Sequence, residues 1–100
     1  MKLIKEEFGL RIYECSNYFD KLFGLMFKKN IEYGILIKNC RSIHTFFMRK
    51  KIDVLFLDMD EQIISVRYNV PAWRVLGEKK ARHVLELPTG YYNNEKKLSE

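Results

Sequence analysis

The sequence is poor in soft metal ligands, with two cysteines, two histidines and no CxxC spacing. Four such ligands could complete a tetrahedral zinc site, but the spacing between Cys40 and His44 is not a zinc-finger pattern. Isolated Cys and His side chains among apolar neighbours are more often packed in a core. We therefore expect no metal and no cofactor, and we expect Cys15 and Cys40 to be reduced thiols.

Long apolar runs are also missing. No segment approaches the roughly 20 apolar residues that span a bilayer. The first residues, MKLIKEEF, place two glutamates where a secretory signal needs its apolar centre. The sequence has no nucleophile elbow, phosphate-binding glycine loop or HExxH helix. These absences predict a cytoplasmic protein without a membrane contact, and they give no support to the common enzyme motifs.

The remaining composition is that of a small globular protein. The chain has 100 residues, of which 47% are hydrophobic and 14% aromatic, so it fits one domain with one core. We expect the ordered part to span about residues 6–90, followed by a polar tail at 91–100. The net charge of +5 attracts polyanions weakly but is low for a dedicated nucleic-acid binder. A monomer or weak dimer is expected.

Alternation of apolar and polar side chains predicts about six short strands. The expected strands cover residues 8–14, 31–38, 43–48, 52–57, 64–70 and 83–87. The segment 52–57 is apolar on both faces apart from Asp53, as expected of a central, doubly covered strand. The acidic residues 58–61 predict a turn that joins it to 64–70 as a β-hairpin.

One helix is expected between the first two strands. Ser16 is a suitable N-cap, and Phe19, Leu22, Phe23 and Met26 recur at helical spacing over residues 17–27. Residues 71–80 are expected to form a loop that carries Trp73. The predicted fold is therefore mainly β, a small barrel or sandwich of about six short strands with one short helix packed against it.

Polar side chains embedded in apolar strands, together with the loop tryptophan, are the candidates for a binding site. The leading hypothesis is a non-enzymatic domain that binds a small ligand or a partner protein at the barrel mouth. The ligand-binding candidates are His44, Met48, Arg49, Asp53, Trp73 and Glu86. Glu86 is expected to meet an arginine, such as Arg11 or Arg67, across the sheet.

Two other functions stay open. One set of residues resembles the combination of charge and stacking that binds single-stranded nucleic acid. Its members are Arg49, Lys50, Lys51, Arg74, Lys79, Lys80 and Arg82, together with Trp73, Tyr91 and Tyr92. Alternatively, His44 and Asp53 could act as base and orienting group, as in a small hydrolase, with Cys40 or Thr45 as nucleophile. The simpler interpretation is that Asp53 binds backbone amides and His44 fills a half-buried position.

Several segments, taken in order, resemble the bacterial and archaeal family called Domain of Unknown Function 192. They are KLFGLM at 21–26, HTFFM at 44–48, IDVLFLD at 52–58, the turn at 59–60, PAW at 71–73 and VLELPTG at 84–90. The resemblance implies a compact, mainly β fold with short helical pieces, and it supplies no reaction. The positions it marks as a shared surface or core are Gly24, Leu25, Met26, Phe47, Met48, Asp53, Asp58, Glu86, Pro88 and Gly90.

The chain departs from the family pattern in three places. Lys21 stands where relatives often have arginine, which would reduce a bidentate anion contact to a point charge. Many relatives continue into a final strand containing Gly-Asp, whereas this chain continues with YYNNEKKLSE. Many relatives also carry an export leader, and its absence here agrees with the predicted intracellular location.

Overall fold

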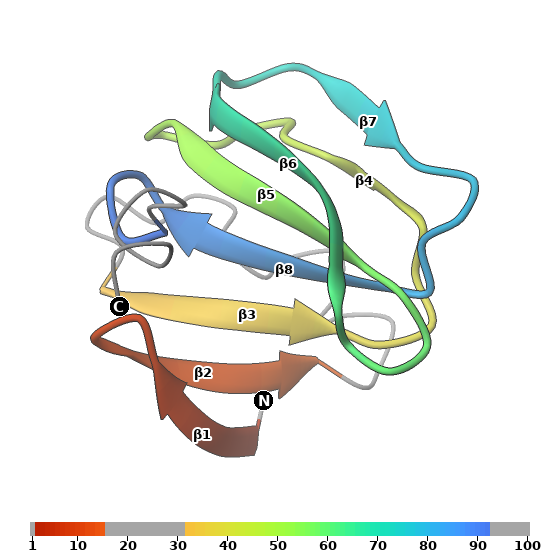
Figure 1. Ribbon diagram of the computed structural model, residues 1–100. Coiled ribbons are helices and arrows are strands. Elements are labelled where there is room, and N and C mark those ends of the chain that lie inside the picture. Colours follow the sequence, from red (N-terminus) through yellow and green to blue (C-terminus); the bar gives the residue numbers. More distant parts are fainter. Residues whose placement is uncertain (1, 16–31, 93–100) are drawn as a thin grey trace.

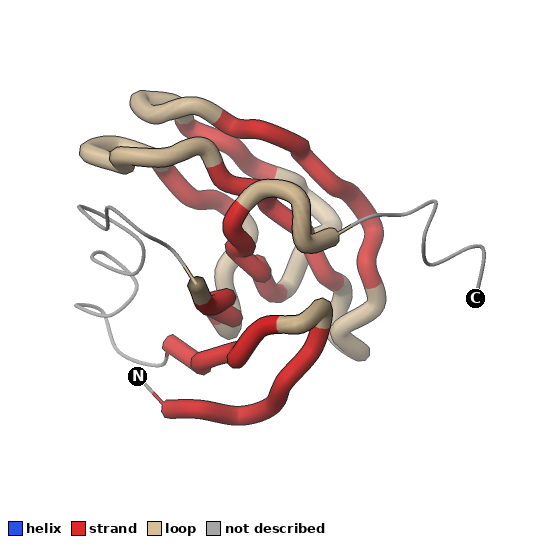
Figure 2. Tube along the Cα trace, turned by 90° about the vertical axis from the view of Figure 1, so that its left-hand side faces the viewer, coloured by secondary structure: helices blue, strands red, loops and turns tan. Residues whose placement is uncertain are grey.

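The computed structural model describes residues 2–15 and 32–92, and these ranges form strands and loops without a helix (Figures 1 and 2). The strands are Lys2–Glu7 (β1), Leu10–Cys15 (β2), Tyr33–Ile37 (β3), Ser42–His44 (β4), Ile52–Leu57 (β5), Ile63–Val70 (β6), Val75–Gly77 (β7) and His83–Pro88 (β8). The prediction of a mainly β fold is confirmed, with two more strands than the six expected. The helix predicted at 17–27 lies outside the described residues.

Six strands form one sheet in the order β1-β2-β3-β8-β5-β6 (Figure 1). The β2–β3 pair is parallel and every other pair in this sheet is antiparallel. β1 and β6 stand at its two edges, so the sheet is open and the barrel prediction is wrong. Pairing order could not be read from the sequence, because strand register is set by tertiary contacts.

The large sheet buries apolar side chains on both faces. Along β5, Ile52, Val54 and Phe56 belong to one buried cluster, whereas Leu55 and Leu57 belong to the other. All six residues of β5 are buried, which confirms the prediction of a central, doubly covered strand. The face containing Val54 is hereafter called face A, and the face containing Leu55 is called face B.

A second, two-stranded sheet is formed by β4 and β7, with Ser42 opposite Gly77 and His44 opposite Val75. Ile43 and Leu76 from these strands pack against the cluster on face A. Two predictions are therefore wrong in detail. The strand expected at 43–48 ends at His44, and the loop expected at 71–80 contains β7. Neither strand has a local signal in the sequence, since each is only three residues long.

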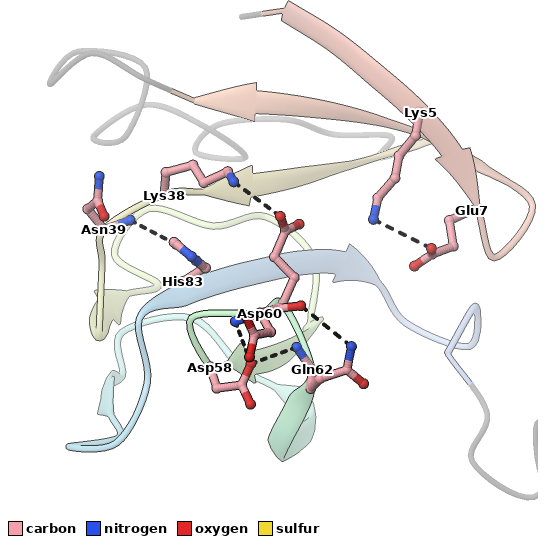
Figure 3. A network of polar contacts seen from close by, with 9 residues as sticks. Lys5, Glu7, Lys38, Asn39, Asp58, Asp60, Gln62 and His83 are labelled. Atoms are coloured by element: carbon pink, nitrogen blue, oxygen red, sulfur yellow. Dashed lines mark hydrogen bonds and ion pairs between the residues drawn. The ribbon is translucent and has the colours of Figure 1, made fainter.

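The hairpin of β5 and β6 is confirmed, and its turn is stabilised as the acidic sequence predicted. The Asp58 carboxylate accepts hydrogen bonds from the amides of Asp60 (2.8 Å) and Gln62 (2.9 Å), which Figure 3 shows. Lys38, which directly follows β3, pairs with Glu61 of this turn at 3.2 Å.

Within residues 2–15 and 32–92, no helix has the length and apolarity that crossing a membrane requires.

Candidate functional site

Pairing of β4 with β7 places the loop at residues 45–48 beside the loop at 71–74, and Thr45 joins them. Its amide donates to the Arg74 carbonyl at 2.8 Å. Its carbonyl accepts from the amides of Met48 (3.2 Å) and Trp73 (3.1 Å). The side-chain hydroxyl donates to the Pro71 carbonyl at 2.7 Å and accepts from the Arg74 amide at 2.9 Å. Thr45 is fully buried, so one residue fixes both loops.

An aromatic patch, defined as His44, Phe46, Phe47 and Trp73, lies on these loops. The His44 and Phe46 rings stack at 4.7 Å between centroids, and Phe46 stacks on Trp73 at 5.4 Å. Phe47 meets the Trp73 ring edge-on at 4.7 Å. Phe47 and Trp73 are 48% and 57% exposed, respectively. The rings therefore form a continuous aromatic group that faces solvent at its outer end.

The two exposed rings sit on strained backbone. Phe47 has φ 64° and Trp73 has φ 65°, both in the left-handed region that bulky residues avoid. Such conformations cost on the order of 1–3 kcal/mol each and persist only where the surroundings impose them. Here the bonds of Thr45 impose them. Strain combined with exposure of two large aromatic side chains marks this end of the molecule as the candidate functional site.

Asp53 fixes the backbone that leads into the loop at 71–74. Its two carboxylate oxygens accept hydrogen bonds from the amides of Asn69 (2.8 Å) and Gly90 (3.3 Å). Asn69 has φ 52°, and the pairing of β5 with β6 is irregular at this point. The carboxylate therefore fixes the end of β6, and Pro71 follows two residues later. This agrees with the simpler interpretation of Asp53 as a residue that binds backbone amides.

Glu86 is buried on face A, where its cross-strand neighbours are Ile35 and Val54. Among the residues that the structure describes, none donates a hydrogen bond to its carboxyl or forms an ion pair with it. Burial raises the pKa of Glu86 from 4.5 to about 7, because the charged form loses its hydration. The carboxyl is thus largely protonated below neutral pH.

The arginines expected to meet Glu86 have other partners. Arg11 lies 3.8 Å from the Glu6 carboxylate. Arg67 hydrogen-bonds to Ser65, pairs with Glu78 at 3.9 Å and lies over the Phe56 ring. The predicted ion pair is therefore wrong. Arg67 is on β6 and Glu86 on β8, with β5 between them, which places Val54 in the position of the expected partner.

The structure brings together four of the six predicted site residues. His44 and Trp73 belong to the patch, while Met48 and Arg49 follow Phe47 directly, Met48 buried and Arg49 exposed. Asp53 and Glu86 stand apart from the patch and from each other. Asp53 is opposite Leu87 and Val54 is opposite Glu86, so the two carboxyls are on different faces of the sheet.

The sequence interpretation missed Phe46 and Phe47 as members of the aromatic patch and Thr45 as the residue that fixes the two loops. Their apolar, β-prone context made them part of a strand, although Phe47 was among the positions marked by the family resemblance. Two adjacent aromatic residues after a threonine were the available signal. The hydrogen bond from the Met48 amide to the Thr45 carbonyl shows that the segment is a turn, and the bonds of Thr45 with residues 71–74 place it beside the second loop.

The structure does not bring His44 and Asp53 together as a hydrolase site would require. The Nδ1 atom of His44 accepts a hydrogen bond from the Phe46 amide at 3.2 Å, and both oxygens of Asp53 are taken by amides. The Thr45 hydroxyl is buried and already bonded in both directions. His44 and Asp53 also belong to different sheets.

The soft metal ligands are dispersed. Cys15 is buried on face A, and the Cys40 thiol donates to the Ser42 carbonyl. His83 accepts from the Asn39 amide at 3.1 Å, as Figure 3 shows. Neither Cys15 nor Cys40 forms a disulfide bond. In residues 2–15 and 32–92, no three His, Cys, Asp or Glu side chains gather where they could hold a metal ion.

Known proteins resemble this chain in sequence over most of its length. The family described as "Uncharacterized ACR", Domain of Unknown Function 192, matches residues 6–97. A UPF0127 protein of Thermococcus sibiricus is 35% identical over 87 residues, covering 80% of this chain and 56% of the relative. A UPF0127 protein of Pyrococcus horikoshii is 35% identical over 83 residues, covering 76% of this chain and 70% of that relative. The chain thus spans little more than half of the Thermococcus relative.

Two solved structures share the fold. A protein of unknown function from Novosphingobium aromaticivorans superposes with a TM-score of 0.71 at 18% identity, covering 81% of this chain and 64% of that one. A protein from Sinorhizobium meliloti superposes with a TM-score of 0.74 at 19% identity, covering 90% and 74%. At these identities the likeness concerns the fold alone.

Proposed function

The chain belongs to Domain of Unknown Function 192, as its sequence motifs indicated, and we propose that it is a non-enzymatic binding module whose contact surface is the aromatic patch. The ligand is held on the outer rings of Phe47 and Trp73. The cytoplasmic location and the oligomeric state, a monomer or weak dimer, remain predictions from the sequence.

The observation that carries the proposal is the left-handed backbone at both exposed aromatic residues. At a purely structural turn, glycine or asparagine adopts such angles at little cost. Here Phe47 and Trp73 occupy them, and nearly half or more of each side chain remains in solvent. Conformational strain of this kind concentrates at ligand-binding and active sites.

Binding is a better match than catalysis for the groups on these loops. The Thr45 hydroxyl has no free hydrogen to donate, because Pro71 accepts it. His44 uses Nδ1 to accept from Phe46. What the loops offer to solvent is aromatic surface held in a fixed geometry, and rigid aromatic side chains are the usual anchors of binding interfaces because little entropy is lost on contact.

The test is recovery of a bound species by native mass spectrometry of protein purified from its own host. We expect a species bound to the wild-type chain to be lost in the Trp73→Ala and Phe47→Ala variants. Met59→Ala is the matched control, since Met59 is 70% exposed but lies in the β5–β6 turn. Recovery of the same species from all variants, or of none from the wild type, would contradict the proposal.

A further inference from the structure

The surroundings of the aromatic patch carry charge of one sign. Residues 39–52 and 62–77, which hold both loops and β4, contain no Asp or Glu. Four exposed cations lie on or next to these loops, each within four residues of Phe47 or Trp73 along the chain: Arg49, Lys50, Lys51 and Arg74. The acidic turn at 58–61 is at the far end of β5. The patch is therefore bordered by cations with no neighbouring carboxylate in sequence.

These cations are not neutralised within the described part of the chain. The ion pairs formed there involve Lys5 with Glu7, Arg11 with Glu6, Lys38 with Glu61, and Arg67 with Glu78. The acid nearest to Lys51 in sequence, Asp53, is buried and bonded to amides. The positive charge at this end of the molecule is thus available to an anionic ligand.

We infer that the ligand of the patch is a single-stranded nucleic acid. This inference rests on the proposed function and names the class of molecule that the same surface takes. Phosphates would contact Arg49, Lys50, Lys51 and Arg74, while a base stacks on Trp73 beside Phe47. Exposed aromatic rings combined with unpaired cations are the pattern by which proteins hold single strands without reading their sequence.

A single strand fits better than a duplex or a simple polyanion. The bases of a duplex are stacked on one another, so their faces are closed to a protein ring. A polyanion without bases would use the cations and leave the aromatic surface in water. Thr45 holds Trp73 and the Phe46–Phe47 turn in place before any ligand arrives, so little ordering is needed when a base stacks.

Trp73 is the only tryptophan in the chain and reports directly on stacking. The probe is a fluorescein-labelled oligothymidylate of about 12 nucleotides, within the usual range for one small domain. We expect binding at low salt with quenching of the Trp73 emission. For single strands the logarithm of the affinity falls by about 0.7 per phosphate contact for each unit of log salt, so four contacts predict a slope of about −3.

The variants separate charge from stacking. Arg49→Ala should reduce the magnitude of the salt slope by about 0.7. Trp73→Ala, followed by the anisotropy of the labelled strand, should weaken binding by about tenfold or more at an unchanged slope. Arg82→Ala is the matched control, because the Arg82 amide bonds to Leu57 at the far end of β5, and it should change neither quantity.

Three results would overturn the inference: no binding of the oligonucleotide at low salt, an unchanged affinity in Trp73→Ala, or equal quenching by heparin, which has charge but no bases. Circular dichroism checks that each variant is folded. If a species from the host still requires Trp73 while oligonucleotides do not bind, the nucleic-acid inference fails and the binding module stands. If no species requires Trp73, both fail.

Discussion

The two buried carboxyls of the sheet, Asp53 and Glu86, are nearly equal in burial and opposite in environment. Asp53 is on face B, with both oxygens bonded to backbone amides. Glu86 is on face A, between Ile35 and Val54, and its pKa is raised to about 7. Burial alone therefore does not tell what a polar side chain does. Its hydrogen-bond partners decide whether it stabilises the fold or opposes it.

The largest expected effect is the pH dependence caused by Glu86. Between pH 4.5 and about 7 the unfolded chain ionises at this residue while the folded chain keeps its proton, so stability falls as pH rises. The shift corresponds to a loss of about 3 kcal/mol by neutral pH, constant above it. Urea unfolding of the wild type and Glu86→Gln from pH 4 to 8 checks this, since glutamine removes the charge.

Glu7→Gln is the matched control for that measurement, because Glu7 is exposed. We expect the free energy of unfolding of Glu7→Gln to vary with pH as in the wild type. That of Glu86→Gln should vary less, because the fall caused by Glu86 is absent. An identical slope in the wild type and Glu86→Gln would show that the pKa of Glu86 is the same in the folded and the unfolded chain.

Removal of the Asp53 carboxylate should destabilise the fold, whereas removal of the Glu86 charge should stabilise it, because the amides of Asn69 and Gly90 lose their acceptor. Asp53→Ala should lower the free energy of unfolding by about 2 kcal/mol. Asp53→Asn keeps one acceptor oxygen and should lose about half as much. Urea unfolding at pH 8 gives both values, and the Trp73 emission should shift to the red if β6 no longer fixes the loop at 71–74. A loss below about 0.5 kcal/mol for Asp53→Ala would remove the contrast with Glu86.

Thr45 extends the comparison to an uncharged polar group. Thr45→Val keeps the shape but leaves the Pro71 carbonyl and the Arg74 amide without a side-chain partner, which should cost about 1.5 kcal/mol. Thr45→Ser keeps the hydroxyl and loses a methyl group, which should lower the free energy of unfolding by about 0.8 kcal/mol. Only the valine variant should move the Trp73 emission. A shift in the serine variant would mean that packing, not hydrogen bonding, holds the loops.

The smallest effect concerns backbone strain at Phe47. Phe47→Gly should be more stable than Phe47→Ala by about 1 kcal/mol, because only glycine accepts φ 64° without cost. At Met59, where φ is not positive, the order should reverse, and Met59→Ala should be more stable than Met59→Gly by roughly 0.5 kcal/mol. Thermal unfolding of the four variants checks both signs. The same order at the two positions would argue that Phe47 is not strained.

Local patterns predicted the parts of the fold that depend on neighbours in sequence. Residues 52–57, the capped turn that follows and residues 83–87 were found because period, length and turn chemistry agree there. The short strands β4 and β7 were not, because each is defined only by its partner across about thirty residues. The open strand order is likewise a property of tertiary contacts.

The candidate site was predicted in part for the same reason. Trp73 and His44 stood out as unusual residues in their segments. Asp53 and Glu86 also stood out, but a sequence does not reveal on which face a residue lies relative to a distant strand. The register that sets Asp53 opposite Leu87 separates the two carboxyls by the thickness of the sheet. Phe47 was hidden because its segment has the composition of a strand.

The position of β8 has a consequence for biosynthesis. This strand follows all the others in the described chain, yet it lies between β3 and β5 in the middle of the sheet. A ribosome-bound chain therefore presents two apolar strand edges until residues 83–88 leave the exit tunnel. During that interval the halves β1-β2-β3 and β5-β6 have no partner between them, and such edges invite pairing with other polypeptides. Translation is therefore a stage at which the edges of β3 and β5 are open to pairing with other polypeptides.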